Sequence, residues 1–302
     1  MQKMQKIIAI VGPTAVGKSA LAVRLARTFN GEVISADSRQ VYKGLDIGTG
    51  KITKKEMRSV PHHLLDVANP RRQFTVVDYQ KLACEKIKEI HSRGNVPIIV
   101  GGTGLYIDTL LGKFAIPDVP PSPKLRRRLE KKPLEALFAL LQKLDPRRAK
   151  AVDPRNPRRL VRAIEIAKAL GRVPRYSVIL KNNRIPLETL SVGLTLPKEH
   201  LRRKIRSRLT KRVEGMTREA GRLHAKGLSW KRMEELGLEY RYISRYVRGL
   251  FTRDEMLQKL ETEIWHYAKR QFTWFKRNKE IKWFQPTEKQ AIERTAAEFI
   301  SA

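Results

Sequence analysis

The sequence predicts an α/β protein, with a parallel sheet flanked by helices and interrupted by a mostly helical inserted domain. Short apolar runs alternate with helix-like stretches through the first third of the chain, which is typical of a parallel sheet. Four prolines then fall within the seven residues 117–123, and a basic helical stretch follows. We therefore expect a core formed by residues 1–117 and 188–302, and an inserted domain over residues 118–187.

The individual elements follow from periodicity and from turn residues. Short apolar runs bounded by turn residues predict strands over residues 6–11, 32–36, 96–100 and 190–196. Apolar residues at helical spacing predict helices over residues 18–29, 76–91 and 124–170, and again from 198 to the end. Thr75 is expected to cap the second of these helices, and regularity breaks between residues 172 and 186.

The charge of the chain points to a polyanionic partner. The net charge is +33, of which +9 falls in residues 1–117 and +24 in the remainder. Such an excess of Lys and Arg is the electrostatic signature of a nucleic-acid-binding protein. The single cysteine, Cys84, excludes a disulfide framework and a zinc site built from several thiolates.

The beginning of the chain and its hydropathy bear on location. No apolar run reaches the roughly 18 residues that a membrane span needs. Residues 1–6 lead directly into the first strand-like run, without the pattern of a secretory signal. We therefore expect a cytoplasmic protein that makes no membrane contact.

A phosphate-binding loop follows the first predicted strand. Residues 12–19 read Gly-Pro-Thr-Ala-Val-Gly-Lys-Ser and match G-x-x-x-x-G-K-[ST] at every position, directly before a predicted helix. In this P-loop, backbone N–H groups surround phosphate oxygens and the helix N-terminus adds partial positive charge. The residues expected to bind phosphate are Gly12, Thr14, Ala15, Val16, Gly17, Lys18 and Ser19. Ser19 is also the candidate ligand for Mg²⁺.

One carboxylate is placed to face this loop. Nucleotide hydrolases hold Mg²⁺ with a second acid at the end of a neighbouring strand, but residues 96–100 lead into Gly-Gly-Thr-Gly. Asp37 instead follows the strand over 32–36, at the edge of the sheet where ligands bind. Asp37 thus faces the bound phosphate, or it serves as a turn aspartate; the pattern alone leaves both open.

Seven strings along the chain together resemble the tRNA dimethylallyltransferases, also called tRNA isopentenyltransferases. In chain order they are Gly12–Ser19, Ser35–Tyr42, Leu45–Thr49, Pro61–Leu64, Gly101–Tyr106, Asn156–Ala163 and Ala268–Phe275. The match runs over nearly the whole chain. The chain departs from the common pattern at Glu239, where many members have glycine.

This resemblance implies a reaction and an active site. The family transfers a dimethylallyl group from dimethylallyl diphosphate to the exocyclic amine of the adenosine immediately 3′ of the anticodon, with Mg²⁺ assisting and diphosphate leaving. It implies that Asp37 is the general base, that Thr103 donates a hydrogen bond near the leaving oxygen, and that Arg212 contacts the diphosphate. Thr103 as a turn-capping residue and Arg212 on a solvated basic face remain the alternatives.

The same resemblance implies contacts with the tRNA anticodon stem-loop. The residues concerned are Asp37, Ser38, Arg39, Gln40, Arg158, Arg159, Leu160, Val161, Arg162, Lys269, Arg270 and Gln271. The alternative for residues 158–162 is a basic helix face within the inserted domain. In the last string, aromatic and basic residues alternate as in RNA-binding segments, although Phe272 or Phe275 is also expected in the core.

Three other functions compete with tRNA prenylation. A small-molecule P-loop kinase explains the loop but not the charge of residues 118–302, and an adenylate isopentenyltransferase needs no basic insertion. An RNA-binding protein without activity does not explain the intact Lys18, Ser19 and Asp37. His62 and His63 have no further ligands at metal-binding spacing and are expected to be structural. We expect a monomer.

Overall fold

The computed structural model of the chain describes residues 5–114, 116–117, 119–174 and 187–302. The chain divides into two compact units, Met1–Leu111 with Ile185–Ala302, and Gly112–Arg184. We call them the catalytic unit and the inserted unit and describe each separately. Position 118, where the inserted domain was expected to begin, and most of the break expected over 172–186 lie outside the described residues.

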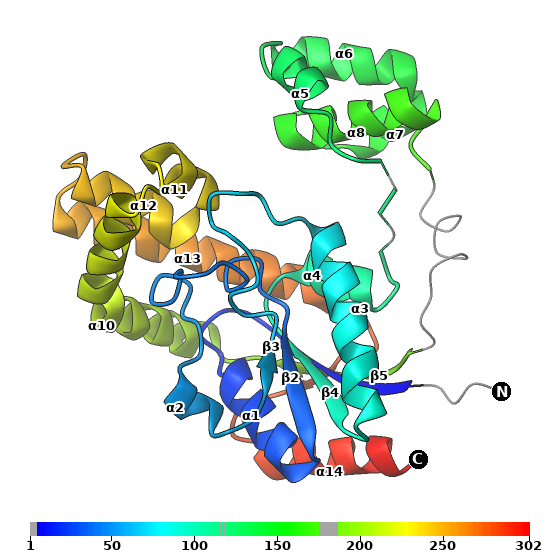
Figure 1. The fold of residues 1–302 in the computed structure, drawn as a ribbon, viewed down its shortest axis with the longest axis vertical. Helices are drawn as coiled ribbons and strands as arrows, with labels where there is room; N and C mark the ends of the chain where they lie inside the picture. Colours follow the sequence, from blue (N-terminus) through cyan, green and yellow to red (C-terminus); the bar gives the residue numbers. More distant parts are fainter. Residues whose placement is uncertain (1–4, 115, 118, 175–186) are drawn as a thin grey trace. The chain divides into compact units, whose positions relative to one another are not determined.

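A parallel sheet forms the centre of the catalytic unit, which confirms the predicted fold class. Its order is β3-β2-β4-β1-β5-β6, and every neighbouring pair is parallel (Figure 1). The strands are β1 (Gln5–Val11), β2 (Gly31–Ser35), β3 (His62–His63), β4 (Val96–Val100), β5 (Leu187–Leu194) and β6 (Lys282–Phe284). The P-loop motif follows β1, so its residues lie at the carboxyl edge of the sheet.

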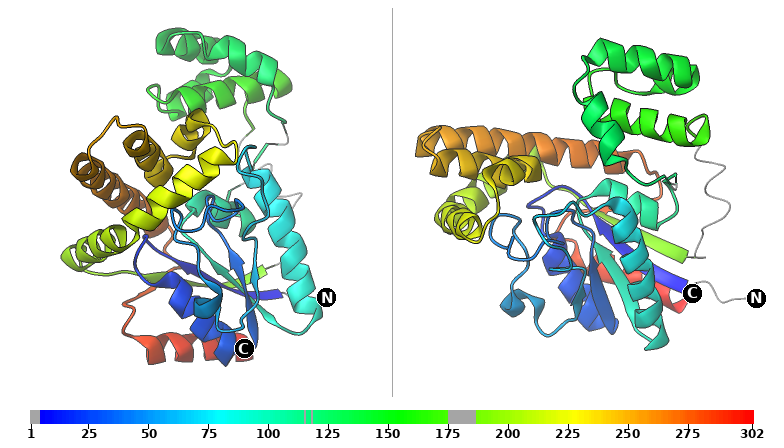
Figure 2. Two further views of the ribbon diagram at one scale, coloured as in Figure 1. Left: turned by 60° about the vertical axis from the view of Figure 1, so that its left-hand side comes forward. Right: turned by 45° about the horizontal axis from the view of Figure 1, so that its top comes forward.

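Helices cover both faces of this sheet, as Figure 2 shows. Side chains of alternate β1 residues point to opposite faces, with Ile8 and Ile10 in one apolar cluster and Ile7 in the other. The first cluster also holds residues of α1 (Lys18–Thr28) and α14 (Lys289–Ser301). The second holds residues of α3 (Val76–Ser92) and α4 (Gly104–Leu110). Thr75 caps α3 in a capping box, as predicted.

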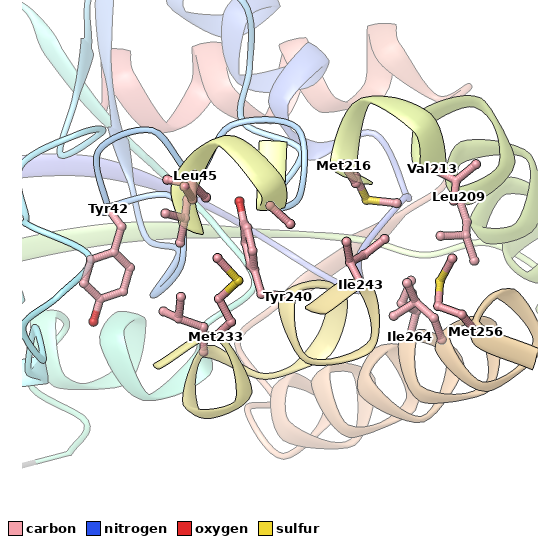
Figure 3. Close-up of a cluster of buried hydrophobic side chains, with 14 of the residues drawn as sticks. Tyr42, Leu45, Leu209, Val213, Met216, Met233, Tyr240, Ile243, Met256 and Ile264 are labelled. Carbon is pink, nitrogen blue, oxygen red and sulfur yellow. The ribbon is translucent and has the colours of Figure 1, made fainter. Parts of the chain in front are cut away.

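A helical layer with its own core completes the catalytic unit. It comprises α10 (Lys198–Ala225), α11 (Trp230–Leu236), α12 (Leu238–Val247) and α13 (Arg253–Lys276). Their apolar faces converge on Val41, Tyr42 and Leu45, which follow β2 in the sequence (Figure 3). The layer is therefore fixed to the loop beyond β2, at the same edge of the sheet as the P-loop. The short α2 (Lys54–Met57) lies in the segment between β2 and β3.

The inserted unit is a small helical body with a separate apolar core. Its helices are α5 (Pro123–Leu129), α6 (Leu134–Leu144), α7 (Pro146–Ala151) and α8 (Pro157–Leu170). Ser122, Asp145 and Asn156 cap α5, α7 and α8, and each is followed by proline at the first helical position. Glu165 is buried and binds Arg126 through two hydrogen bonds of 2.8 Å. These caps and this ion pair add to the stability that the unit gains from its apolar core.

The structure corrects two expectations about secondary structure. The chain is not helical from Lys198 to the end, because β6 pairs with β5 before α14 begins. The three residues of β6 are too few to show the alternating pattern of a strand, and their partner strand β5 is far away in the sequence. The strand expected over 190–196 runs instead over 187–194. Of the two phenylalanines in the last motif, Phe275 is buried and Phe272 is 36% exposed. No helix among the described residues is long and apolar enough to cross a membrane.

Candidate active site

The P-loop is held open by left-handed backbone at three positions. Gly12, Ala15 and Gly17 have φ values of 135°, 62° and 107°. A Cβ at Gly12 would lie 2.4 Å from the carbonyl oxygen of Leu194 in β5, so only glycine fits there. Gly17 is the N-cap of α1 and offers no capping side chain. The first N–H groups of the helix are therefore left for an anion.

Lys18 places a partly desolvated cation beside this loop. Its Nζ donates a 2.7 Å hydrogen bond to the Pro13 carbonyl oxygen. Burial lowers the pKa of Lys18 to about 8, the negative charge of Asp37 opposes this shift, and Arg208 adds to it. A bound diphosphate would raise this pKa again by supplying the missing negative charge.

A cavity of about 1240 Å³ surrounds these groups. Ligand sites in proteins usually measure about 300–1,000 Å³, so this one has room for more than one small ligand. Besides the P-loop residues 14–19, it is lined by Asp37, Gln40, Thr49, Gly50, Gly101, Gly102, Lys204, Arg208, Tyr267 and Gln271, among others. The ends of β2 and β4 and the helices α10 and α13 thus meet the P-loop at one place.

Asp37 is a turn aspartate whose side chain also lines the cavity. Its Oδ1 accepts hydrogen bonds from the backbone N–H of Arg39 (2.8 Å) and of Gln40 (3.3 Å), as a turn aspartate does. In the part of the chain that the structure describes, Oδ2 makes no hydrogen bond, and the side chain lines the cavity. One oxygen orients the carboxylate and the other is left for a ligand.

Thr103 joins the carboxyl ends of two neighbouring strands. Its Oγ1 accepts a 3.0 Å hydrogen bond from the backbone N–H of Ser38, so it ties the end of β4 to the end of β2. It is the N-cap of α4, but its side chain makes no capping hydrogen bond. Tyr267 lines the cavity, whereas Thr103 lies just behind the lining, bonded to Ser38. The hydrogen bond near the leaving oxygen that the resemblance implies for Thr103 stays a prediction.

The last motif string contributes to the site from inside the protein. Gln271 is buried; its Oε1 accepts from the Thr14 N–H (2.8 Å) and its Nε2 donates to the Gly102 carbonyl (3.0 Å). Both ends of the amide are thus occupied within the protein. Thr14 and Gln271 also line the cavity, and their contacts with phosphate and with tRNA stay predictions. Lys269 and Arg270, on the same helix, are exposed.

Two further residues on the cavity lining, Tyr267 and Arg208, were not predicted from the sequence. Tyr267 lies one helical turn before Gln271, so the i, i+4 spacing on α13 was the signal that could have found it. Burial, followed by the charge of Asp37, raises the pKa of Tyr267, which therefore stays protonated. Arg208 lies one turn before Arg212 on α10 and donates a 3.1 Å hydrogen bond to the Gly50 carbonyl.

Arg212 lies next to this cavity but not on its lining. Its Nη2 is buried without a hydrogen-bond partner among the described residues, and burial lowers the pKa of its guanidinium. A Cβ on Gly50 would lie 3.0 Å from Arg212 Nη1 and 1.9 Å from Arg208 Nη2. Glu239, where the chain departs from the family pattern, partly offsets the pKa shift of Arg212. Arg212 therefore has a buried nitrogen with unused hydrogen-bonding capacity close to the cavity.

The expected tRNA-binding residues fall into two groups. Ser38, Arg39 and Gln40 are half-buried beside Asp37. In the inserted unit, Arg158 and Arg159 are exposed on α8, and the half-buried Arg162 lies 3.5 Å from Glu165. The expectation that Leu160 and Val161 contact tRNA is wrong for their side chains. Both side chains are buried in the core of that unit and cannot reach RNA.

Histidine, cysteine and carboxylate side chains form no metal-binding cluster in the described residues. His63 instead binds Glu32 through Nε2 at 2.6 Å, in keeping with the structural role expected for it. Ser19, an exposed residue on the cavity lining, is the one P-loop hydroxyl at the position that normally binds Mg²⁺. Mg²⁺ on a diphosphate keeps several waters and needs few protein ligands, so Ser19 fits such an ion.

A P-loop at the carboxyl edge of a parallel sheet, facing a carboxylate across a large cavity, defines an α/β enzyme that acts on a phosphorylated ligand. The family model described as IPP transferase matches residues 40–278. The chain therefore belongs to the IPP transferase family, as the motifs predicted, and is an enzyme of the prenyltransferase class.

Individual relatives agree with this assignment. The tRNA dimethylallyltransferase of Thermomicrobium roseum is 41% identical over 293 residues, which cover 95% of this chain and 88% of the relative. The solved tRNA isopentenylpyrophosphate transferase of Bacillus halodurans is 38% identical, with a TM-score of 0.74 over 99% of this chain and 97% of the other. A solved eukaryotic dimethylallyltransferase acting on tRNA is 27% identical, with a TM-score of 0.82 over 98% and 80% of the two chains.

Proposed function

We propose that the chain transfers a dimethylallyl group from dimethylallyl diphosphate to tRNA. The acceptor is the exocyclic amine of the adenosine immediately 3′ of the anticodon, and diphosphate is released. One observation carries the proposal: Lys18 of the P-loop and the carboxylate of Asp37 line the same cavity, where the charge of Asp37 favours the protonated form of Lys18. A diphosphate and a general base are thereby brought together.

The donor end of the cavity stabilises the leaving group. The N–H groups at the start of α1, Lys18 and Arg208 would surround a diphosphate in the P-loop, and Arg212 would lie next to it. As the carbon–oxygen bond breaks, its electron pair stays on the diphosphate oxygen. Fixed positive charges in a partly buried site stabilise that developing charge more than water does. Mg²⁺ held by Ser19 would supply further positive charge to the diphosphate.

The acceptor end provides a base. The adenine amine forms a bond to the dimethylallyl carbon and must lose one proton. Asp37 Oδ2, which has no hydrogen bond in the described residues, is the atom placed to take it. Hydrogen bonds to Oδ1 hold the carboxylate in one orientation, so little reorganisation is needed when the proton moves.

Recognition of tRNA follows from exposed basic residues. The target base must leave its stack to reach a cavity, as in other base-modifying enzymes. Ser38, Arg39 and Gln40 lie beside Asp37, where the flanking nucleotides of such a base would pass. Arg158, Arg159, Lys269 and Arg270 provide exposed charge for the phosphate backbone. We also propose that the protein is a cytoplasmic monomer; light scattering of the purified chain tests the second part.

A competition between acceptors tests the function. Purified protein is incubated with labelled dimethylallyl diphosphate, Mg²⁺, AMP and an unmodified tRNA that carries adenosines 3′ of its anticodon. We expect the label in tRNA alone. Label in AMP would instead indicate an adenylate isopentenyltransferase. Label in neither acceptor, with ATP consumed in the presence of a small-molecule acceptor, would indicate a kinase.

A further inference from the structure

The segment Leu45–Thr49, one of the motif strings, has no role in the reaction described above. It forms a loop whose three successive N–H groups point at one carboxylate. Asp46, Ile47 and Gly48 donate to Glu219 of α10 at 3.0, 2.8 and 2.9 Å. The Tyr240 hydroxyl donates to the same carboxylate at 2.6 Å. Successive N–H groups in this arrangement form an anion-binding concavity, and here the protein supplies the anion itself.

The arrangement depends on both carboxylate oxygens. Glu219 is 2% exposed, with Oε2 accepting two of the four hydrogen bonds and Oε1 the other two. A glutamine in this place would turn an NH₂ group towards N–H donors and leave some of them without an acceptor. The close approach also explains Gly48, because a Cβ there would lie 2.6 Å from the Tyr240 ring.

The far side of the same loop forms part of the cavity. Thr49 and Gly50 line it, and their carbonyl oxygens both lie 3.5 Å from Gln40 Nε2. The Gly50 carbonyl also accepts the 3.1 Å hydrogen bond from Arg208 Nη2. The loop therefore stands between the buried carboxylate and two side chains that line the cavity, Gln40 and Arg208.

We propose that Glu219 is a positioning residue for the transfer reaction: by fixing the loop 45–50, it sets where Arg208 meets the diphosphate and where Gln40 meets the acceptor. This inference rests on the proposed function and adds a residue that touches neither substrate. Arg208 lowers the pKa of Lys18, which supports the placement of Arg208 beside the P-loop. Displacements of about 1 Å in such groups reduce rates by as much as a hundredfold.

The test compares Glu219→Gln with Glu32→Gln. Glu32 is also a buried carboxylate with four hydrogen-bond contacts, but it lies near the amino end of β2. We measure the melting temperature of both variants. At a temperature well below melting, we then measure kcat, KM for dimethylallyl diphosphate and the Kd of inorganic diphosphate. We expect both variants to melt earlier. Only Glu219→Gln should weaken diphosphate binding and lower kcat/KM, by about tenfold each.

A double-mutant cycle separates positioning from general destabilisation. Arg208→Gln alone should weaken diphosphate binding, and Glu219→Gln should then add little in that background, because both changes remove the same contribution. Equal losses in the two backgrounds would overturn the proposal. Diphosphate binding by calorimetry requires no turnover, so this result stands even if the wild-type protein fails to prenylate tRNA.

Tyr240→Phe covers the case in which Glu219→Gln does not fold. It removes one of the four donors and keeps the ring in the core. We expect a weaker effect in the same direction, about two- to threefold on the Kd of diphosphate, as loss of one hydrogen bond predicts. An unchanged Kd in Tyr240→Phe together with an unchanged or unmeasurable Glu219→Gln would overturn the proposal.

Discussion

Two carboxylates, one near each end of β2, differ in how far the protein satisfies their hydrogen-bonding capacity. At the amino end, Glu32 is buried and accepts hydrogen bonds from Arg93 (2.9 and 3.0 Å) and Asn95 (2.8 Å), with His63 at 2.6 Å. At the carboxyl end, Asp37 uses one oxygen within its turn and presents the other to the cavity. A carboxylate whose hydrogen-bonding capacity is filled by the protein contributes to stability, whereas one left incomplete can bind and react.

The largest effect is expected at the carboxyl end. Asp37→Asn keeps an oxygen for the hydrogen bonds from Arg39 and Gln40 but removes the base. We expect kcat to fall by about 10²–10⁴, the usual contribution of a general base. The melting temperature and tRNA binding should stay close to those of the wild type. Single-turnover prenylation with saturating substrates measures the effect, and an unchanged rate would remove Asp37 from the mechanism.

The next effect concerns the cation that faces Asp37. Lys18 has its pKa lowered to about 8 in the free protein, so it is charged below that pH and neutral above it. We expect kcat/KM for dimethylallyl diphosphate to fall above about pH 8, approaching tenfold per pH unit. In Lys18→Met this limb of the pH profile should disappear, along with most of the activity. A wild-type profile that stays flat to pH 9.5 contradicts the assignment.

The inserted unit offers the same comparison between a charged side chain that is paired within the protein and one that is exposed. Arg126 is paired with Glu165, whereas Arg158 and Arg159 are exposed. Replacing Arg158 and Arg159 by Gln should weaken tRNA binding severalfold and reduce the salt dependence, log K against log salt, by about one unit per lost phosphate contact. The kcat with saturating tRNA should be unchanged. A salt dependence equal to that of the wild type would show that these arginines do not contact phosphate.

The smallest effect on activity is expected at the amino end of β2. Glu32→Gln should lower the free energy of unfolding by about 1–3 kcal/mol, the cost of leaving buried groups unpaired. The kcat should stay within about twofold of the wild-type value, since Glu32 is remote from the reacting atoms. Denaturant titration and steady-state kinetics measure the two quantities. A tenfold loss of kcat in a folded Glu32→Gln protein would show that Glu32 contributes to activity and not to stability alone.

The contribution of Glu32 to stability should depend on pH. Burial acts to raise the pKa of Glu32, but the hydrogen bonds from Asn95, His63 and Arg93 outweigh it, and the pKa is lowered. The stabilisation is therefore present above the ordinary pKa range of glutamate and is lost as the pH falls through the lowered value. Glu32→Gln should unfold less steeply with acid than the wild type does.

The amino-acid sequence by itself determined the fold class, the P-loop and the family. These features depend on local patterns: short apolar runs, a glycine-rich loop between a strand and a helix, and strings of fixed spacing. Asp37 could be placed as well, because the carboxyl ends of parallel strands share one edge of the sheet. The same reasoning could not choose between a residue that faces the ligand and a turn aspartate. The structure shows a turn aspartate whose side chain also lines the cavity.

Tertiary structure decided what each motif residue does. Gln271, which the motif placed among the RNA-binding residues, joins Thr14 to Gly102, and Thr103 joins the ends of two strands by bonding to Ser38. The strand β6 and the residue Glu219 left no trace in local periodicity. Their partners lie about 90 and 170 residues away in the chain, and only packing brings them together. Whether a polar atom is free or occupied depends on such distant partners, and in this protein that determines which residues are left to react.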